Sequence, residues 1–259
     1  MVPKRPSFQD LSNLPPELAL LVLSHLNATD LCLASCVWTN LGNDELLWHG
    51  LCRSQWRQVS AYRHQSQSSI SFKELYMKLD EGTLTFNADP ELGMDYLMKN
   101  RLVDDTPMDI ALYIHTARHI NYESRRLFLS KRSEPDVLDH IVQLQSFENQ
   151  FLPNALRRFF NETGPPNERN DYLSYLVEKF SDRFCTCNPN LGFSKDTVYV
   201  VCFSLIMLSV DLTSPHVRNK MSKREFIRNT RQAVQGINDD FAGHLYDNVY
   251  LIGHVAPKA

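Results

Sequence analysis

The sequence has no dominant charge and no long apolar run. Its 259 residues include 27 basic and 30 acidic ones, a formal net charge of −3, which gives no reason to expect nucleic acid or an anionic membrane as the main partner. The most apolar stretch, residues 198–210, is shorter than the roughly 20 residues that cross a bilayer. Residues 1–6 precede no apolar signal core, and Val2 stands where N-myristoylation requires glycine. We therefore expect no transmembrane segment and a cytosolic or nuclear protein.

The sequence also lacks a catalytic triad and a metal-binding cluster. Cysteines stand at positions 32, 36, 52, 185, 187 and 202. A zinc site would need a second pair of cysteines or histidines at finger-like spacing from Cys185 and Cys187, and none is present. Cys32 and Cys36 fall four apart in a helical pattern, and Cys202 lies in the apolar run, so we interpret these three as buried thiols and not disulfides. We expect no metal and no cofactor.

Sustained alternation of apolar and polar residues, the pattern of strands, is absent, and helical patterns recur instead. A capping residue followed by proline marks two helix starts, at Asp89-Pro90 and Thr106-Pro107. Amphipathic runs follow at residues 121–129, 137–147, 151–160 and 172–183. The sequence therefore predicts an all-α fold.

Residues 196–229 form the most informative segment. The segment begins as a helix that is apolar on every side, which is typical of a core helix. It breaks at residues 211–215, and Ser222 with Glu225 then has the spacing of a capping box at the next helix start. The basic residues between 218 and 224 are interpreted as a solvated helix face, with a docking patch as the alternative.

The first 54 residues predict three short helices, and a stretch rich in Gln, Ser, Arg and His follows them. Leu14-Pro15-Pro16 begins the first helix, Asn27 to Asp30 cap the second, and Asn43-Asp44 open the third. A unit this small buries too little surface to be stable alone, so it must lean on a partner or on the rest of the chain. We assign residues 55–85 to a linker and a connecting helix.

The first module, residues 8–54, resembles an F-box. The resemblance lies in the opening Leu-Pro-Pro-Glu-Leu and the closing Leu-Leu-Trp, at residues 14–18 and 46–48. It implies that an exposed apolar face docks the Skp adaptor of an SCF ubiquitin ligase. The residues expected on that face are Leu14, Pro15, Leu18, Leu21 and Leu31. A helical cap on the larger domain is the alternative.

Residues 86–252 resemble the Arf guanine-nucleotide-exchange domain, called the Sec7 domain. The matches are its Phe-Asn and Asp-Pro opening at residues 86–90, an Arg-Phe-Cys-Thr-Cys-Asn-Pro block at 183–189, and a second signature over 199–229. The block makes Cys185 and Cys187 family structure and not a metal pair. An F-box joined to such a domain is the arrangement of the F-box only protein 8 family, which this chain resembles. We thus expect a small three-helix module plus an elongated multi-helix domain.

The resemblance implies two functional parts in the second domain. One is a glutamate that displaces GDP by repelling its β-phosphate, and Glu168 is the candidate for it. The alternatives are a solvated loop carboxylate and a register in which Arg169 takes that position. The other part is a groove for an Arf-family GTPase. The residues expected to form it are Ile206, Met207, Leu208, Asp211, Leu212, Thr213, Pro215 and Met221.

Three functions remain open from the sequence. The chain is an F-box adaptor that selects an Arf-family GTPase or a related trafficking protein for ubiquitination, a nucleotide-exchange factor controlled by its ligase, or a scaffold. The family motif FRLPGEAQ reads Thr-Gly-Pro-Pro-Asn-Glu-Arg-Asn at residues 163–170, so we expect exchange to be weak or lost. We expect recruitment to membranes only transiently and through Arf.

Overall fold

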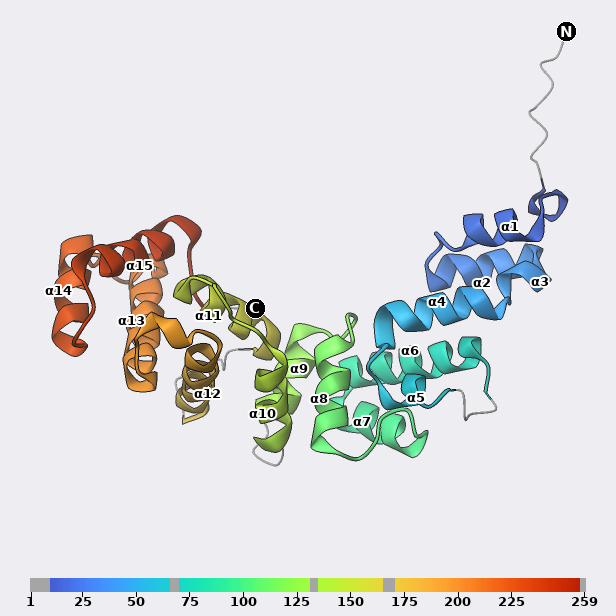
Figure 1. Cartoon of the computed structure of the whole chain (residues 1–259), viewed down its shortest axis with the longest axis horizontal. Helices are drawn as coiled ribbons and strands as arrows, with labels where there is room; N and C mark the ends of the chain where they lie inside the picture. The colour runs from blue at the N-terminus through green and yellow to red at the C-terminus, as the bar shows by residue number, and fades with distance from the viewer. Residues whose placement is uncertain (1–9, 66–69, 131–134, 165–170, 257–259) are drawn as a thin grey trace, which may run out of the picture. The chain divides into compact units, whose positions relative to one another are not determined.

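The structure, a computed structural model, describes residues 10–65, 70–130, 135–164 and 171–256 (Figure 1). Helices account for its regular elements, and the described ranges contain no strand, which confirms the all-α prediction. The chain divides into two compact units, Met1–His119 and Ile120–Ala259. We refer to them as the N-terminal and the C-terminal unit.

The N-terminal unit runs from blue to light green in Figure 1. Its elements are η1 (Leu11–Asn13), α1 (Pro16–Leu23), α2 (Ala28–Val37), α3 (Thr39–Gly42), α4 (Glu45–Trp56), α5 (Ser60–Arg63), α6 (Phe72–Ala88), α7 (Pro90–Lys99) and α8 (Pro107–Thr116). Side chains of Asn27, Asp44, Asp89 and Thr106 accept bonds from the first-turn amides of α2, α4, α7 and α8. The capping signals in the sequence therefore fixed these helix starts.

The small helical module formed by α1 to α4 completes its core on α6. The rings of Trp48 and Trp56 in α4 lie edge-on to Tyr76 of α6, with centroids 5.6 and 4.7 Å apart. The carboxylate of Glu45 accepts a bond from the Phe72 amide at 3.0 Å. Cys52 lies fully buried in this interface, and burial raises the pKa of its thiol to about 12. A core too small to be stable alone thus gains aromatic partners from the following helix.

Two stretches differ from the sequence prediction. The stretch expected as a linker contains the end of α4 and all of α5, where Trp56 and Val59 are buried. The connecting helix α6 does not end within the predicted stretch but continues past residue 85 to Ala88, because Thr83 is buried inside the unit and its hydroxyl group bonds to Tyr113 at 2.7 Å. Local composition could not reveal these tertiary contacts.

Gly93 allows α6 and α7 to cross closely. A Cβ atom on Gly93 would lie 2.2 Å from Cα of Phe86, a backbone atom that cannot turn aside. Gly50 on α4 is exposed and has open space around it. Replacement of each glycine by alanine therefore compares the same change at a crowded position and at an open one.

We expect Gly93→Ala to destabilise the protein by about 1–3 kcal/mol through overpacking, which lowers the melting temperature by roughly 3–10 °C. Gly50→Ala should raise it by about 1–4 °C, because alanine restricts the unfolded chain and suits a helix interior. Thermal melts followed by circular dichroism measure both variants. Equal melting temperatures for the two variants would contradict the close crossing.

The C-terminal unit runs from light green to red in Figure 1. Its elements are α9 (Tyr122–Ser130), α10 (Pro135–Leu144), α11 (Leu152–Thr163), α12 (Asp171–Cys187), η3 (Pro189–Leu191), α13 (Lys195–Thr213), α14 (Lys223–Ala233) and α15 (Asp239–Ile252). Rings of Phe147, Phe159, Phe180 and Phe184 pack at the centre of its core. Helices α11, α12, α14 and α15 all contact α13.

Helix α13 is the core helix that the sequence predicted, although it is longer than expected. It continues through Asp211 to Thr213, so the predicted break begins only at Ser214. By length and a mean hydropathy of 1.6 it could cross a membrane. Its buried side chains, which include Cys202 and Leu205, lie instead among those of the neighbouring helices. We interpret α13 as the core helix of this unit.

The cysteines follow the buried-thiol interpretation only in part. Cys202 is fully buried, and burial raises the pKa of its thiol. Cys32 is half-buried, whereas Cys36 is exposed, because α2 presents that side to solvent. All six are free thiols. Among the described residues, no group of three or more His, Cys, Asp or Glu side chains could hold a metal ion.

Candidate functional site

The first candidate surface consists of the large apolar side chains that α1, α2 and α4 of the N-terminal unit expose to solvent, and we call it the apolar face. Leu18 and Leu21 of α1 are 50% and 59% exposed, while Ala19 and Leu23 of the same helix are buried. The other large apolar side chains exposed in this module are Val22, Leu33, Val37 and Leu46. Monomeric proteins seldom leave so many large apolar groups in water on one small module, so this face is suited to cover by a partner.

A shallow pocket of about 420 Å³ adjoins this face where α2 runs into α3. Leu14 and Pro16 line it on one side, and Val37 with Trp38 lines it on the other. The indole Nε1 of Trp38 donates to the Asp10 carboxylate at 2.6 Å, which holds the segment before α1 against α2. The pocket could receive one apolar side chain of a partner.

Four of the five adaptor-binding candidates are at least partly exposed to solvent. Leu18, Leu21 and Pro15 are exposed, and Leu14 is half-buried at the pocket. Leu31 is a correction, because it is only 1% exposed and belongs to the core of the module. Leu33, Val37 and Leu46 are exposed as well, although they were not among the predicted adaptor-binding residues. These three residues are apolar but do not fall on the buried side of their helices, and this pattern could have indicated their exposure.

The second candidate surface lies along α13 in the C-terminal unit. Tyr199, Phe203, Met207 and Val210 recur at the spacing of one helix face, and they are half-buried or exposed. The rings of Tyr199 and Phe203 lie 4.9 Å apart between centroids. We call these four residues the α13 stripe. Tyr199 and Phe203 pack partly against the core, while Met207 and Val210 are exposed, which makes the stripe a candidate contact surface.

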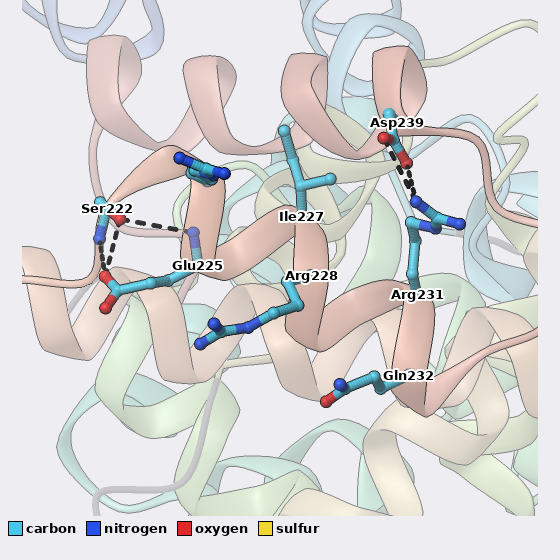
Figure 2. Close-up of a pocket in the computed structure, with 8 residues that line it drawn as sticks. Ser222, Glu225, Ile227, Arg228, Arg231, Gln232 and Asp239 are labelled. Atoms are coloured by element: carbon cyan, nitrogen blue, oxygen red, sulfur yellow. Dashed lines mark hydrogen bonds and ion pairs between the residues drawn. The ribbon is translucent and has the colours of Figure 1, made fainter.

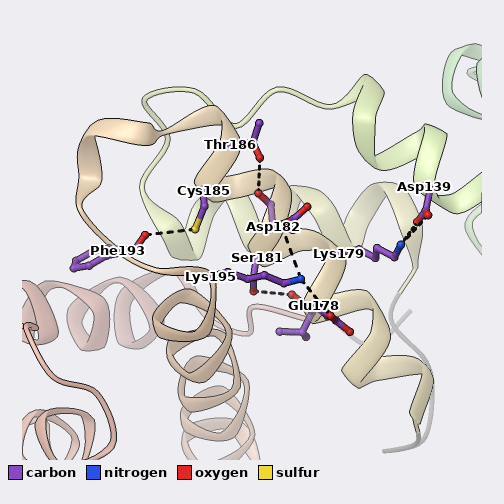
Figure 3. A network of polar contacts seen from close by, with 10 residues as sticks. Asp139, Glu178, Lys179, Ser181, Asp182, Cys185, Thr186, Phe193 and Lys195 are labelled. Atoms are coloured by element: carbon purple, nitrogen blue, oxygen red, sulfur yellow. Dashed lines mark hydrogen bonds and ion pairs between the residues drawn. The ribbon is translucent and has the colours of Figure 1, made fainter.

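A groove of about 320 Å³ between α12 and α13 continues the stripe. It is lined by Asp171, Ser174, Tyr175, Glu178, Lys195, Asp196 and Tyr199. Lys195 pairs with Glu178 at 3.2 Å, which joins the two helices (Figure 3). Lys179, which follows Glu178 on α12, pairs with Asp139 of α10 at 2.6 Å. Ion pairs on both sides of α12 therefore hold one wall of the groove in place.

The loop after α13 is fixed by polar contacts of its own. The Asp211 carboxylate accepts a bond from the Met221 amide at 2.7 Å, and Lys220 Nζ donates to the carbonyl oxygens of Asp211 and Ser214. Tyr246 of α15 donates to the Met221 carbonyl at 2.9 Å. The predicted capping box is confirmed, with Ser222 and Glu225 bonded reciprocally (Figure 2). Asp211 thus anchors the loop.

The structure separates the predicted groove residues into two groups. Met207, Thr213 and Pro215 are exposed, and Asp211, Leu212 and Met221 are half-buried. Ile206 and Leu208 are corrections as groove floor, because they are 5% and 1% exposed and face the core. Ser209 beside them is also buried, with its hydroxyl group bonded to the Ile206 carbonyl. Residues adjacent in sequence lie on different faces of a helix, so a continuous motif on α13 contains both exposed and buried residues.

The candidate exchange residue Glu168 lies outside the described residues, as does its neighbour Arg169. The described residues before them show how the loop leaves α11. Thr163 is fully buried and bonds the Phe159 carbonyl, so this position stays anchored without an apolar side chain. Gly164 has φ +77°, and a Cβ there would lie 2.8 Å from Cβ of Arg126. A larger residue at position 164 would be strained, so the chain leaves α11 by a glycine-dependent path.

Comparisons with known proteins match two parts of the chain to known families. The family model of the Sec7 domain matches residues 76–251, and an F-box-like model matches residues 11–54. F-box only protein 8 of Homo sapiens is 59% identical over 253 residues, which cover 96% of this chain and 79% of that protein. Cytohesin-2 of Homo sapiens is 32% identical over 176 residues, 66% of this chain and 44% of that protein.

Solved structures resemble the same region. The Sec7p catalytic domain superposes with a TM-score of 0.60 at 28% identity, covering 66% of this chain and 96% of that one. A Sec7 domain bound to ARF1-GDP and Brefeldin A gives a TM-score of 0.62 at 21% identity and covers 73% of this chain and 95% of that one, a likeness of fold.

Proposed function

Because the chain belongs to the F-box only protein 8 family and joins an F-box to a Sec7 domain, we propose that it is the substrate adaptor of an SCF ubiquitin ligase. The face around Leu18 and Leu21 binds the Skp adaptor. The α13 stripe with the α12–α13 groove binds an Arf-family GTPase, which the ligase then modifies with ubiquitin. The observation that carries the proposal is the presence of two separate exposed apolar surfaces, one in each unit.

The two surfaces have the character expected of protein interfaces. Each presents large apolar side chains beside polar ones, as in the buried centre and polar rim of a specific complex. The groove contributes the carboxylates of Asp171, Glu178 and Asp196 with Lys195 among them. This rim favours a partner surface that is neutral or basic. A GTPase held here lies on the same polypeptide as the ligase-binding module, which raises its effective concentration at the ligase.

Nucleotide exchange is the second candidate function, and we expect it to be weak or lost. The sequence keeps a proline and a glutamate at positions 166 and 168, but Thr163 and Gly164 replace the Phe and Arg of the family motif. Gly164 also bends the chain through a conformation that arginine rarely adopts. The loop therefore leaves α11 differently from a loop with arginine at that position. Arg169 beside Glu168 would further offset the charge that repels GDP.

An exchange assay tests this part of the proposal. Arf loaded with a fluorescent GDP analogue should release it at close to the spontaneous rate when the chain is added, and Glu168→Lys should leave that rate unchanged. An active Sec7 domain in the same assay serves as the positive control. Fast release that Glu168→Lys abolishes would show that the chain is an exchange factor, and would contradict the proposed loss of catalysis.

A further inference from the structure

Helix α14 and the loop before it carry a concentrated positive charge. Between residues 218 and 231 stand six basic residues and one acidic residue, a net charge of +5 in a chain whose net charge is −3. The basic residues are Arg218, Lys220, Lys223, Arg224, Arg228 and Arg231, and most of their side chains are exposed. Neither the apolar face of the N-terminal unit nor the α13 stripe includes any of these basic residues. We call it the α14 basic face.

Two of these six cations are neutralised by an ion pair within the described part of the chain. Lys223 pairs with Asp247 at 2.6 Å, Arg231 pairs with Asp239 at 3.1 Å, and Lys220 bonds loop carbonyl groups. Arg218, Arg224 and Arg228 have no ion-pair partner among the described residues.

Figure 2 shows Ile227 and Arg231 pointing toward α15, whereas Arg228 points away from it. All three line a shallow hollow of about 810 Å³. Arg224 also lines this hollow, one turn before Arg228. Glu225 in the same hollow interacts electrostatically with Arg228 but forms no ion pair with it. Both arginines are exposed, so their guanidinium groups are accessible to an external anion.

Exposed apolar side chains form the last turn of α15, and the turn before it pairs with the start of α14 through Asp247 and Lys223. Tyr250, Leu251 and Ile252, the last turn of α15, are 67%, 78% and 61% exposed. The ring of Tyr250 stacks on Tyr246, whose hydroxyl group bonds the Met221 carbonyl just before α14. The apolar end of α15 and the basic start of α14 are thus neighbours.

The end of α15 is held rigidly. Arg157 of α11 donates to the Asn248 side chain at 2.6 Å and to the carbonyl oxygens of Gly253 and His254 at 2.8 and 3.2 Å. Gly253 terminates the helix with φ +100°. The exposed position of Leu251 and Ile252 is therefore fixed by bonds on both sides of them. They do not belong to a fraying end that could fold back.

We propose that the α14 basic face and the end of α15 together dock on an anionic phospholipid surface. The unpaired arginines attract the lipid phosphates, and the leucine and isoleucine enter the boundary between headgroups and acyl chains. Tyrosine is favoured at that boundary, because its ring is apolar and its hydroxyl group remains hydrated. An acidic peptide would satisfy the arginines but would leave the apolar turn exposed, so the membrane accounts for both features.

This surface gives the chain a membrane contact that does not require an Arf-family GTPase. It therefore goes beyond the proposed function and can be tested without any partner protein. Each cation close to an anionic leaflet contributes about 1 kcal/mol, so loss of two should reduce binding roughly 30-fold.

Sedimentation with vesicles tests the proposal on the full chain. We expect binding to vesicles of 70% phosphatidylcholine and 30% phosphatidylserine, binding that falls as salt is raised, and little binding to pure phosphatidylcholine. Arg224→Gln with Arg228→Gln should weaken it roughly 30-fold. Leu251→Ser should weaken it several-fold, and this exposed position leaves the fold intact.

The matched control changes two exposed arginines elsewhere, Arg53→Gln and Arg118→Gln, and should bind as the unaltered chain does. A fluorescent polyglutamate peptide separates the two kinds of anionic partner. The proposal is overturned if the chain does not bind the phosphatidylserine vesicles, or if the control weakens binding as strongly. It is also overturned if only the peptide binds in a manner that depends on Arg224 and Arg228.

Discussion

Replacing Leu18 and Leu21 by aspartate is expected to lower the affinity of the chain for the Skp adaptor by at least about 100-fold, since burying each leucine contributes roughly 1.5–3 kcal/mol. Both side chains are at least half exposed on α1, so their loss leaves the core of the module intact. A carboxylate at either position would in addition have to be desolvated in the interface. Titration of the labelled chain with purified Skp adaptor measures the change.

The control for this experiment replaces two leucines outside the face. Leu84 on α6 and Leu92 on α7 are 63% and 61% exposed and belong to the same unit. Leu84→Asp with Leu92→Asp should bind the adaptor like the unaltered chain. Equal loss of binding in both double variants would mean that the α1 face is not the adaptor surface.

The second large effect is expected on the α13 stripe. Met207→Asp combined with Val210→Asp should reduce binding of nucleotide-free Arf at least about 100-fold, because two apolar contacts are lost and two carboxylates enter the interface. Adaptor binding should be unchanged, since those residues belong to the other unit. Surface-immobilised Arf treated with a chelator to remove nucleotide provides the measurement.

The matched control places the same charges on the N-terminal unit. Met108 and Leu84 are 44% and 63% exposed there, so Met108→Asp with Leu84→Asp changes the chain equally without touching the stripe. This variant should bind Arf normally. If the variant with Met207 and Val210 replaced binds Arf with unchanged affinity, the α13 stripe is not the GTPase-binding surface.

Most of the fold could be predicted from local signals. Capping residues such as Asn27, Asp89 and Ser222 fixed helix starts, because a first-turn amide needs an acceptor wherever the helix lies. The length of α6 could not be predicted, since its second half depends on burial of Thr83 and on its bond to Tyr113. Tertiary contacts of this kind leave no trace in the nearby sequence.

The candidate site was predictable only to the level of segments. The second signature marked the correct helix, yet Ile206 and Leu208 face the core while Met207 between them is exposed. A motif is continuous in sequence, whereas a surface takes one residue from each turn. Leu31 was wrongly predicted to be exposed, because an apolar residue of α2 can belong either to the core or to a partner interface. Burial decides between these roles, and it requires the packed structure.

The central claim is that one chain links the Skp adaptor to an Arf-family GTPase, and a pull-down tests it most directly. Immobilised Skp adaptor is incubated with Arf in its GDP, GTP and nucleotide-free states, with and without the chain. We predict that Arf is retained only when the chain is present, and that the Leu18 and Leu21 variant abolishes its retention. Retention of the chain without Arf in all three states would contradict the account.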